Sequence, residues 1–263
     1  MLNDLDMIVH QFPGEIDIYP IADVHLGAIE HDESRWQAFI KKIEREDAYL
    51  IIAGDMINNS TRGTKFANPF DEVLRPREAK RRMVEYLTQI KDRVLCYVGG
   101  NHEARSVRES DQDISYDICA KLGIEHLYRE DVAFMSVGVG HRNTEKKSIA
   151  SYTFAVAHGN GGGYLTGTAL NKSERFGGQV LEGVDCIVTG HVHKGIVSHP
   201  AKLVVDPRNR YVSVRTYYVV SCVSWLNYGG YAAKAMLTPA EVCNPQKLHL
   251  VASRDYKKII TTW

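Results

Sequence analysis

The sequence predicts an α/β fold with parallel strands, and three observations support that prediction. Short apolar runs of strand length alternate with segments whose apolar residues recur at helical spacing, as in βαβ units. The run at residues 49–53 is apolar throughout, as parallel strands covered on both faces are. With 263 residues and 44% hydrophobic content, the chain can bury one large core. We therefore expect a single domain over residues 1–263.

The first expected βαβ unit begins with a strand over residues 15–22, which runs directly into Asp23-Val24-His25. Ser34-Arg35-Trp36-Gln37 has the form of a capping box, and the apolar residues from Trp36 onward keep helical spacing. A second strand over residues 49–53 ends in Gly54-Asp55. Each strand of this unit therefore delivers a carboxylate at its end.

The middle of the chain continues the alternation. Residues 58–69 are polar and small, which indicates a surface loop, and Pro76 suits the first position of the next helix. The apolar stripe expected on that helix is Met83, Leu87 and Ile90. A third strand over residues 94–98 leads into Gly99-Gly100-Asn101-His102-Glu103. The later expected elements are a helix over 114–122 that Gly123 ends, strands over 132–139 and 149–157 joined around Asn143, and a strand over 186–188.

Beyond Lys194 the pattern changes to alternating apolar and polar residues. The segments 202–205, 211–223 and 247–251 predict antiparallel strands, and little helix is evident. We interpret these strands as the second sheet of the same core. No repeat, linker or low-complexity tract marks a domain boundary.

Composition limits where the protein acts and what it contacts. Lys plus Arg and Asp plus Glu both number 32, so the formal net charge is zero, and any contact with DNA or RNA must be local. No apolar stretch approaches the roughly 20 residues that span a bilayer, and the chain start lacks the features of a signal peptide. The cysteines are scattered without a C-x-x-C pair, which predicts buried free thiols: Cys96, Cys119, Cys186, Cys222 and Cys243. We expect a cytoplasmic protein with no membrane partner.

Five of the expected strands are each followed at once by residues that can bind a metal. These residues are Asp23 and His25, Asp55, Asn101, His158, and His191 and His193. Ligands of open α/β sheets bind outside the carboxyl ends of the strands, so the side chains should meet at one rim. A lone histidine beside a strand is more often structural, but five such strand ends are hard to explain that way.

The donor types indicate which ions the rim would bind. Imidazole disfavours a pure Mg²⁺ or Ca²⁺ cage, and the absence of thiolate disfavours structural zinc, which leaves Mn²⁺, Fe²⁺ or Zn²⁺. There are more donors than one ion needs, so a two-metal centre with a bridging carboxylate is expected. Two ions about 3.5–4 Å apart can hold a hydroxide and clamp both sides of an in-line displacement at phosphorus.

The same residues carry a resemblance to a known family. Asp23-Val24-His25, Gly54-Asp55, Gly100-Asn101-His102-Glu103, His158 and Gly190-His191-Val192-His193, in that order, resemble the five-part signature of the calcineurin-like metallophosphoesterases. The resemblance covers roughly residues 16 to 195. It implies a four-layer α/β/β/α sandwich of two packed mixed β-sheets flanked by helices, and a metal-dependent phosphoesterase.

The resemblance also implies a role for each residue. The first ion would be held by Asp23, His25 and His193, and the second by Asn101, His158 and His191. Asp55 would bridge the two divalent ions, among which Mn²⁺ is favoured. His102 would donate a proton to the leaving-group oxygen. Glu103 would either orient His102 or begin the next helix.

One departure from the family pattern indicates which branch of the family the chain resembles. In the protein Ser/Thr phosphatase branch the Gly-Asp motif continues to an aspartate and a phosphate-binding arginine, whereas this chain reads Gly54-Asp55-Met56-Ile57-Asn58-Asn59. This argues against a protein phosphatase. It favours the branch of bacterial, archaeal and bacteriophage phosphodiesterases that includes the SbcD-type nucleases, although no capping or ATPase-partner domain of that kind is evident.

Three features could determine which substrate is bound, and each also has a simpler explanation. Arg105 could clamp a phosphate, or it could be a solvated loop arginine. The backbone of residues 159–163, rich in glycine, could bind phosphate oxygens or only turn tightly. A basic cluster could form a nucleic-acid groove or the solvated side of a helix. Its members are Arg75, Arg77, Lys80, Arg81 and Arg82, with Lys172 and Arg175 as a smaller group.

The leading hypothesis is a two-metal phosphodiesterase that uses a metal-bridging hydroxide as nucleophile and His102 as acid, with DNA or RNA as a candidate substrate. The alternative within enzymes is a phosphomonoesterase or nucleotide phosphatase, because the same groups would serve either. A non-catalytic scaffold subunit is the alternative from a different class. All expected ligands are present, which disfavours it.

Overall fold

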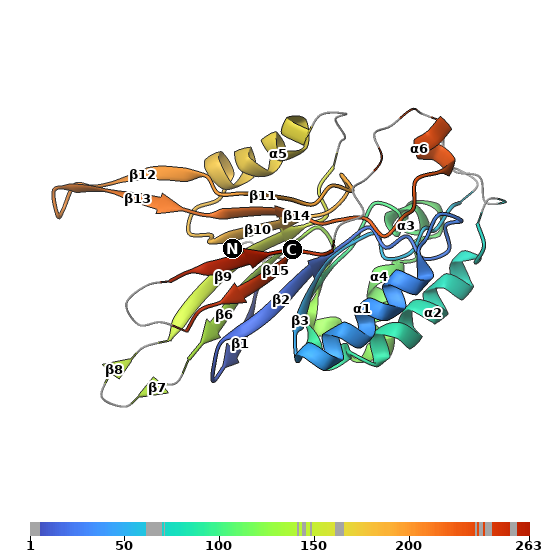
Figure 1. Cartoon of the computed structure of the whole chain (residues 1–263), viewed down its shortest axis with the longest axis horizontal. Coiled ribbons are helices and arrows are strands. Elements are labelled where there is room, and N and C mark those ends of the chain that lie inside the picture. Colours follow the sequence, from blue (N-terminus) through green and yellow to red (C-terminus); the bar gives the residue numbers. More distant parts are fainter. Residues whose placement is uncertain are drawn as a thin grey trace.

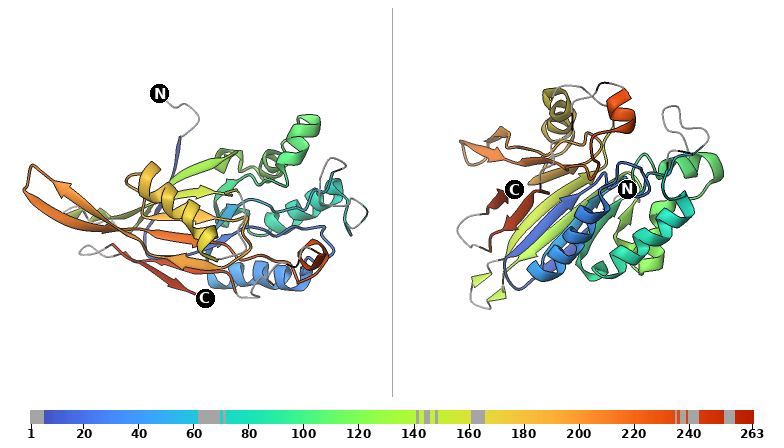
Figure 2. Two further views of the ribbon diagram at one scale, coloured as in Figure 1. Left: turned by 90° about the horizontal axis from the view of Figure 1, so that it is seen from above. Right: turned by 45° about the vertical axis from the view of Figure 1, so that its right-hand side comes forward.

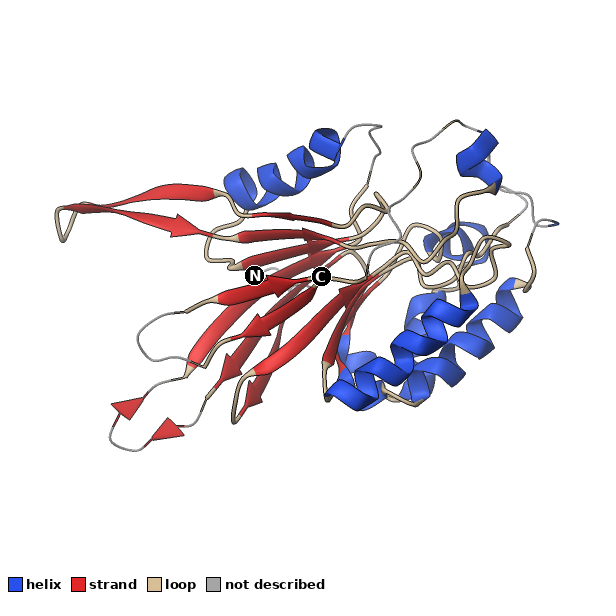
Figure 3. Cartoon of the chain, viewed as in Figure 1, coloured by secondary structure: helices blue, strands red, loops and turns tan. Residues whose placement is uncertain are grey.

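The computed structural model describes residues 6–61, 70, 72–140, 142–143, 146–147, 149–160, 166–234, 236, 239, 244–252 and 257–263. Within these residues, two mixed six-stranded sheets pack against each other. Helices lie on the outer side of each sheet, so the molecule has four layers (Figures 1 and 3). This is the α/β/β/α sandwich expected for the chain.

The first sheet has the order β16-β15-β2-β3-β4-β5. Its parallel part consists of β2 (Ile16–Ile21), β3 (Tyr49–Ala53), β4 (Val94–Val98) and β5 (Tyr128–Arg129). Its antiparallel edge consists of β15 (Lys247–Leu250) and β16 (Ile259–Thr262). The strands β3 and β4 are almost wholly buried, because this sheet is covered on both faces.

The second sheet has the order β1-β6-β9-β10-β14-β11. Its strands are β1 (Met7–Phe12), β6 (Val132–Val139), β9 (Ala150–Ala157), β10 (Cys186–Thr189), β14 (Tyr218–Ser221) and β11 (Ile196–Ser198). Two separate pairs lie outside both sheets: β7 (Arg142–Asn143) with β8 (Lys146–Lys147), and β12 (Ala201–Asp206) with β13 (Tyr211–Thr216).

The helices divide between the two outer layers. The first sheet is covered by α1 (Glu33–Glu46), α2 (Pro76–Thr88) and α4 (Ile114–Leu122), with α3 (Ala104–Ser110) beside the strand ends (Figures 1 and 2). The second sheet carries α5 (Thr166–Arg175), and α6 (Gly230–Lys234) is a short helix. Single 3-10 turns lie at Lys91–Arg93 and Glu125–Leu127, and a π-helical turn lies at Phe176–Val180.

Helix α1 shows how the sequence forms one of these elements. Its buried side consists of Trp36, Phe39, Ile40 and Ile43, at the spacing expected. The capping prediction was wrong, however. The helix begins at Glu33, and the carboxylate of Asp32 accepts from the backbone N–H of Arg35 at 3.0 Å. Aspartate is at least as good an N-cap as serine, so the helix starts two residues earlier than the capping box at Ser34 predicts.

The prediction for the end of the chain was wrong in part. Of the described strands beyond Lys194, β11 and β14 join the second sheet, β15 and β16 extend the first sheet, and β12 and β13 pair with each other. The expected strand over residues 211–223 is interrupted at Tyr217. Alternation identifies strands but not their partners, because a partner is chosen by contacts between residues far apart in sequence.

Two predictions about composition can be compared with the structure. Cys96, Cys119, Cys186 and Cys222 are buried free thiols, as expected, and Cys243 lies outside the described residues. No helix in the described part of the chain is both long and apolar enough to cross a membrane.

Candidate metal centre

The predicted ligands come from both sheets. Asp23 and His25 follow β2, Asp55 follows β3, and Asn101 follows β4, all in the first sheet. His158 follows β9, and His191 and His193 follow β10, in the second sheet. The sequence led us to expect one rim of one sheet. The site instead lies where the carboxyl ends of strands from two packed sheets meet.

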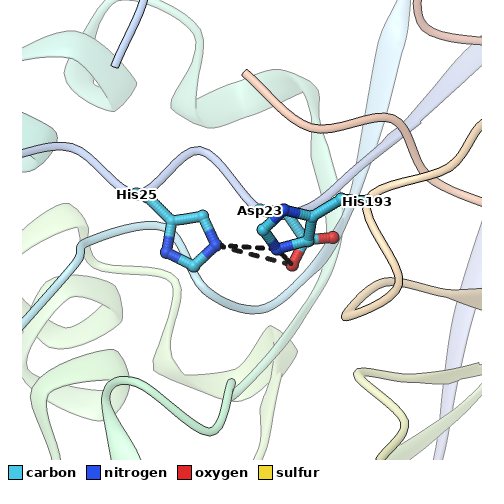
Figure 4. Close-up of side chains that lie close together, drawn as sticks. All are labelled: Asp23, His25 and His193. Carbon is cyan, nitrogen blue, oxygen red and sulfur yellow. Dashed lines mark hydrogen bonds and ion pairs between the residues drawn. The ribbon is translucent and has the colours of Figure 1, made fainter. Parts of the chain in front are cut away.

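One group of donors consists of Asp23, His25 and His193, which Figure 4 shows together. Their ligand atoms all lie within 4.8 Å of one another. The two imidazoles face each other with Nε2 atoms 3.1 Å apart, and the Asp23 Oδ1 is 3.8 Å from His25 Nε2 and 3.4 Å from His193 Nε2. Asp23 and His25 are buried, while a third of the His193 side chain is exposed.

A second group forms around Asn101, whose side-chain oxygen lies 2.9 Å from His158 Nε2 and 2.7 Å from His191 Nδ1. Asp55 belongs to this group as well, with its Oδ2 at 3.2 Å from His158 Nε2. The ligand atoms of Asp55, His158 and His191 lie within 4.8 Å of one another. The second group therefore combines a carboxylate, an amide oxygen and two imidazoles.

Asp55 lies between the two groups. Its Oδ2 is 3.8 Å from His25 Nε2 in the first group and 3.2 Å from His158 Nε2 in the second. Burial alone would raise the pKa of Asp55, but the imidazoles of His102 and His158 outweigh burial and hold that pKa well below its usual range. Asp55 is thus an anion in contact with donors of both groups.

The donor set fits divalent cations, as His158 illustrates. Its Nδ1 lies 2.7 Å from the Ala53 carbonyl oxygen, which can only accept, so Nδ1 carries a hydrogen and Nε2 faces Asp55 and Asn101. Burial opposes protonation of this ring, but the charge of Asp55 raises the pKa of His158 to about 10. The proton on His158 Nε2 therefore lies between this nitrogen and the oxygens of Asp55 and Asn101. A bound metal ion would replace that proton and contact the same atoms.

Because the ion must replace that proton, metal affinity should depend on pH. The pKa of His158 is raised to about 10, so its proton is bound at all lower pH values and competes with the metal. We expect the Mn²⁺ association constant to rise by about tenfold per pH unit between pH 6 and 9. Titration calorimetry in buffers of different ionisation enthalpy measures the proton released. A pH-independent affinity would contradict this, and His249→Gln, on β15, should leave the slope unchanged.

The backbone at the site is strained. Five predicted ligands have positive φ angles, a region that residues other than glycine rarely adopt. These are Asp23 at 55°, His25 at 49°, Asp55 at 53°, His191 at 71° and His193 at 56°. Each such residue costs about 1–3 kcal/mol and persists only where its surroundings enforce it.

Backbone contacts between loops that are far apart in sequence hold these residues in their strained conformations. The N–H of His25 donates to the Asp55 carbonyl at 3.0 Å, and the N–H of Trp225 donates to the Asp23 carbonyl at 3.1 Å. A Cβ at Gly100 would lie 2.1 Å from the Asp55 nitrogen, so the loops after β3 and β4 touch through their backbones. Glycine is required at position 100 by this close approach.

A known protein family matches more than half of the chain. The sequence profile of the calcineurin-like phosphoesterase family matches residues 16–195. The chain belongs to this family. It is therefore a metal-dependent hydrolase that acts on phosphoesters. No curated protein sequence matches the chain significantly.

Solved structures that resemble the chain share little sequence with it. The phosphoesterase YfcE from E. coli is 14% identical over 94% of this chain and 98% of its own, with a TM-score of 0.38. A cold-active protein tyrosine phosphatase is 12% identical over 97% of this chain and 81% of its own, with a TM-score of 0.35.

In this calcineurin-like phosphoesterase, His102 is directed toward the donors by a backbone carbonyl. Its Nδ1 lies 2.6 Å from the Asn58 carbonyl oxygen, so Nδ1 carries the hydrogen. The opposite nitrogen, Nε2, is 3.7 Å from Asp55 Oδ2, and the ring lies 4.4 Å from that of His25. Burial lowers the pKa of His102 to about 4, although the nearby negative charge of Asp55 opposes this shift. Nε2 is thus the atom that could exchange a proton at the site.

Two asparagines contact His102 and position it, and the sequence did not predict a role for either. Besides the Asn58 carbonyl, the buried Asn59 donates from Nδ2 to the His102 carbonyl at 2.7 Å and to Ser106 Oγ at 3.0 Å. The Asn58 carbonyl leaves no signal in the sequence, but the polar side chain of Asn59, four residues after Asp55, is a signal that could have identified that residue.

Glu103 has a role that the sequence did not suggest. The helix α3 begins directly after it, as one of the two interpretations proposed. Its buried carboxylate, however, accepts from the N–H groups of Asp55 at 3.2 Å and Ile57 at 2.9 Å. Glu103 therefore positions the loop that carries Asp55. Burial, together with the charge of Asp55, raises the pKa of Glu103 to about 7.

Replacing Glu103 should destabilise the fold in proportion to the acceptors that are lost. Glu103→Ala leaves two buried N–H groups without an acceptor and should lower the free energy of unfolding by about 2–4 kcal/mol. Glu103→Gln keeps one acceptor oxygen and should lose about half as much. Urea unfolding of both metal-free variants measures the difference. Equal losses would mean that these hydrogen bonds are not what Glu103 contributes.

Arg105 lies beside His102, but it is engaged by the same loop. Its Nη1 donates to the carbonyl oxygens of Asn58 at 3.0 Å and Asn59 at 3.4 Å, and its side chain is half-buried. Burial lowers the pKa of Arg105. A phosphate-binding role for it stays a prediction.

The basic cluster on α2 is largely paired with carboxylates. Lys80 lies 2.7 Å from Asp117, and Arg82 lies 2.8 Å from Glu33. Arg81 pairs within the helix with Glu85 at 2.6 Å. These pairs favour the solvated helix surface over a nucleic-acid groove. In the smaller cluster, Lys172 donates to Asn160, and the glycines at 161–163 lie outside the described residues.

Proposed function

We propose that this calcineurin-like phosphoesterase is a phosphodiesterase that works with two divalent ions. The proposal rests on one observation, which is that the buried Asp55 carboxylate lies next to donors of both groups. Asp23, His25 and His193 would hold one ion, Asn101, His158 and His191 the other, and Asp55 both. Oxygen and imidazole donors without thiolate favour Mn²⁺, with Fe²⁺ or Zn²⁺ as alternatives.

When bound, two such ions supply an activated water molecule and neutralise charge on the phosphoryl group. The protein's own contribution is the rigid placement of the donors and a proton at His102 Nε2. Because the pKa of His102 is lowered to about 4, this nitrogen is unprotonated at neutral pH in the ligand-free protein. A bound anionic phosphoester raises that pKa, so His102 acquires its proton with the substrate and gives it to the leaving oxygen.

The local charge supports a diester rather than a monoester. A phosphomonoester carries nearly two negative charges at neutral pH, whereas a diester carries one. Arg105 is the guanidinium beside His102, and its Nη1 is already bound to the carbonyl oxygens of Asn58 and Asn59. Within the described residues, an arginine bound in this way adds little positive charge for a second negative charge on the phosphate, which suits the monoanion. DNA and RNA are the diesters to test first.

The test compares two substrates with the same leaving group. With Mn²⁺, we expect kcat/KM for bis(p-nitrophenyl) phosphate to exceed that for p-nitrophenyl phosphate by about tenfold or more. Single-stranded DNA, duplex DNA, RNA and cyclic nucleotides then identify the class of diester. Metal analysis of the purified protein identifies the native ion.

Each other result has a definite meaning. A preference for the monoester would favour a phosphomonoesterase or nucleotide phosphatase. Turnover of no phosphoester, with tight binding of a partner, would favour a scaffold. Asp55→Asn serves as the control that separates activity of this site from contamination.

A further inference from the structure

His31 is a histidine of the loop between β2 and α1, and its side chain is buried, with 3% exposed. It is not among the predicted metal ligands. Its Nδ1 lies 2.8 Å from the Val24 carbonyl oxygen, which can only accept, so Nδ1 carries the hydrogen and is the donor. Val24 stands between Asp23 and His25, two donors of the first group. His31 therefore fixes the backbone between two predicted ligands.

The other ring nitrogen of His31 makes no comparable contact. Within the described residues, the buried Nε2 has no hydrogen-bond partner, although it lies 3.4 Å from Oε2 of Glu33. Burial lowers the pKa of His31, so the ring is neutral at neutral pH. A buried polar atom without a partner costs about 1–3 kcal/mol. An apolar side chain would fill this position without that cost, so what the histidine adds is the N–H that reaches Val24.

The Val24 carbonyl belongs to the peptide plane that leads into His25. The N–H of this plane, on His25, donates to the Asp55 carbonyl at 3.0 Å, and its carbonyl accepts from His31 at 2.8 Å. Both ends of one peptide plane are therefore held. The φ angle of His25 is 49°, which persists only where the surroundings enforce it. Without the His31 donor, the plane can rotate, which relieves the strain at His25 and moves its imidazole away from the other donors.

The carbonyls on either side of Val24 are held in a different way. That of Asp23 accepts from the N–H of Trp225 at 3.1 Å, and that of His25 accepts from the N–H of Ala28 at 3.0 Å. These two donors belong to the backbone, which a substitution leaves in place. The donor to Val24 belongs to a side chain, so this contact can be removed by substitution.

The backbone around His31 is joined to the segment that holds Asp23. His31 pairs with Leu226 in an isolated bridge, and the N–H of Asp32 donates to the Trp225 carbonyl at 2.9 Å. Trp225 is also the residue whose N–H binds the Asp23 carbonyl. His31 thus has a fixed position relative to the first group of donors.

The second group of donors is oriented by other residues. His158 Nδ1 lies 2.7 Å from the Ala53 carbonyl oxygen, and Asp55 Oδ1 accepts from the backbone N–H of His102 at 2.8 Å. Contacts of this kind that orient metal ligands contribute strongly to metal affinity.

We propose that His31 is a positioning residue, which sets the affinity of the ion held by Asp23, His25 and His193 and leaves the affinity of the other ion unchanged. It acts through the Val24 carbonyl and contacts neither ion nor substrate. The assignment of the donors to two ions rests on the proposed function.

The test is calorimetric titration of the full chain with Mn²⁺. His31→Leu removes the N–H and should weaken one of the two ions by about 10- to 100-fold, and the other by less than about twofold. His31→Asn offers an N–H at the position of the histidine Nδ1, so it should restore the affinity to within about threefold of the wild type. Should His31→Leu not fold, His31→Phe replaces it, because phenylalanine keeps a planar ring without a donor.

Removing one ligand from each group identifies the affected ion. When His193→Ala is present, the remaining ion should not respond to His31→Leu. When His158→Ala is present, the remaining ion should be weakened by the same factor as in the otherwise unchanged chain.

The matched control is His10→Leu. His10 also lies at hydrogen-bond distance from a backbone carbonyl, with its Nε2 2.8 Å from that of Leu95, and it is outside the donor groups. Urea unfolding of the metal-free proteins should show lower stability for both leucine variants, whereas only His31→Leu should change Mn²⁺ binding.

The titrations separate failure of this inference from failure of the proposed function. A wild type that binds fewer than two ions contradicts the proposed function, and the role of His31 then stands only if the ion that His193→Ala removes is the one that His31→Leu weakens. Where two ions bind, unchanged affinities in His31→Leu, or equal weakening of both ions, would overturn the inference. An asparagine variant that binds no better than the leucine variant would also overturn it.

Discussion

His102→Ala should lower turnover by about 10²–10⁴-fold for a phosphodiester with a poor leaving group, such as an alkyl alcohol. The reason is that Nε2 of His102 faces Asp55 and the donors, while its Nδ1 is bound by the Asn58 carbonyl. A nitrophenolate leaving group needs little protonation, so its release should be affected much less. Measuring kcat for both substrates at saturating Mn²⁺ gives the comparison.

The metal content of this variant is the second half of the measurement. His102 is not among the six residues, besides Asp55, that would hold the ions, so the variant should bind metal nearly as the wild type does. Equal loss on both substrates, or loss of metal, would assign His102 a structural role. His10→Ala removes a half-buried histidine of β1 and is the matched control.

Asp55→Asn should have the largest effect of any single change at the site. We expect binding of both ions to weaken by at least about 100-fold, because the substitution removes the one charge shared by both donor groups. Turnover should fall by about 10³-fold or more whatever the leaving group. Calorimetric titration with Mn²⁺ and metal analysis after dialysis measure the two sites.

The number of metal ions that this variant loses shows whether Asp55 binds both ions or only one. If only one equivalent of metal is lost, Asp55 belongs to one group and the bridging role is wrong. Asp17→Asn makes the same chemical change on the neighbouring strand, β2, where Asp17 pairs with Lys247 at 3.1 Å. It should leave metal binding unaffected.

Much of the fold could be predicted because its core strands are short and strongly apolar. The predicted strands at 49–53 and 94–98 coincide with β3 and β4, and the helix at 114–122 coincides with α4, which Gly123 ends in a left-handed cap. β1 was missed because it is an edge strand with alternate residues exposed. α5 was missed because Thr166, Gly167 and Thr168 are weak helix formers.

At the site, too, the sequence predicted some features and not others. The sequence predicted seven donors at strand ends, and the structure brings these side chains together around Asp55, where one of the groups that could hold an ion also includes His102. It did not identify the supports: the Asn58 carbonyl behind His102, or the Glu103 carboxylate beneath Asp55. Backbone carbonyls carry no sequence signal, and a buried glutamate is indistinguishable from a helix-starting one until its partners are known.

By itself, the sequence determined which groups gather, because every parallel strand ends at the same edge of its sheet and a polar residue placed there must join the others. Only the tertiary structure decided that two sheets share the site, that Glu103 holds the Asp55 loop, and that His31 binds the Val24 carbonyl. Those features depend on contacts between residues far apart in sequence, such as His25 and His193, which are 168 positions apart. Local pattern carries no information about such contacts, since packing of the whole chain selects them.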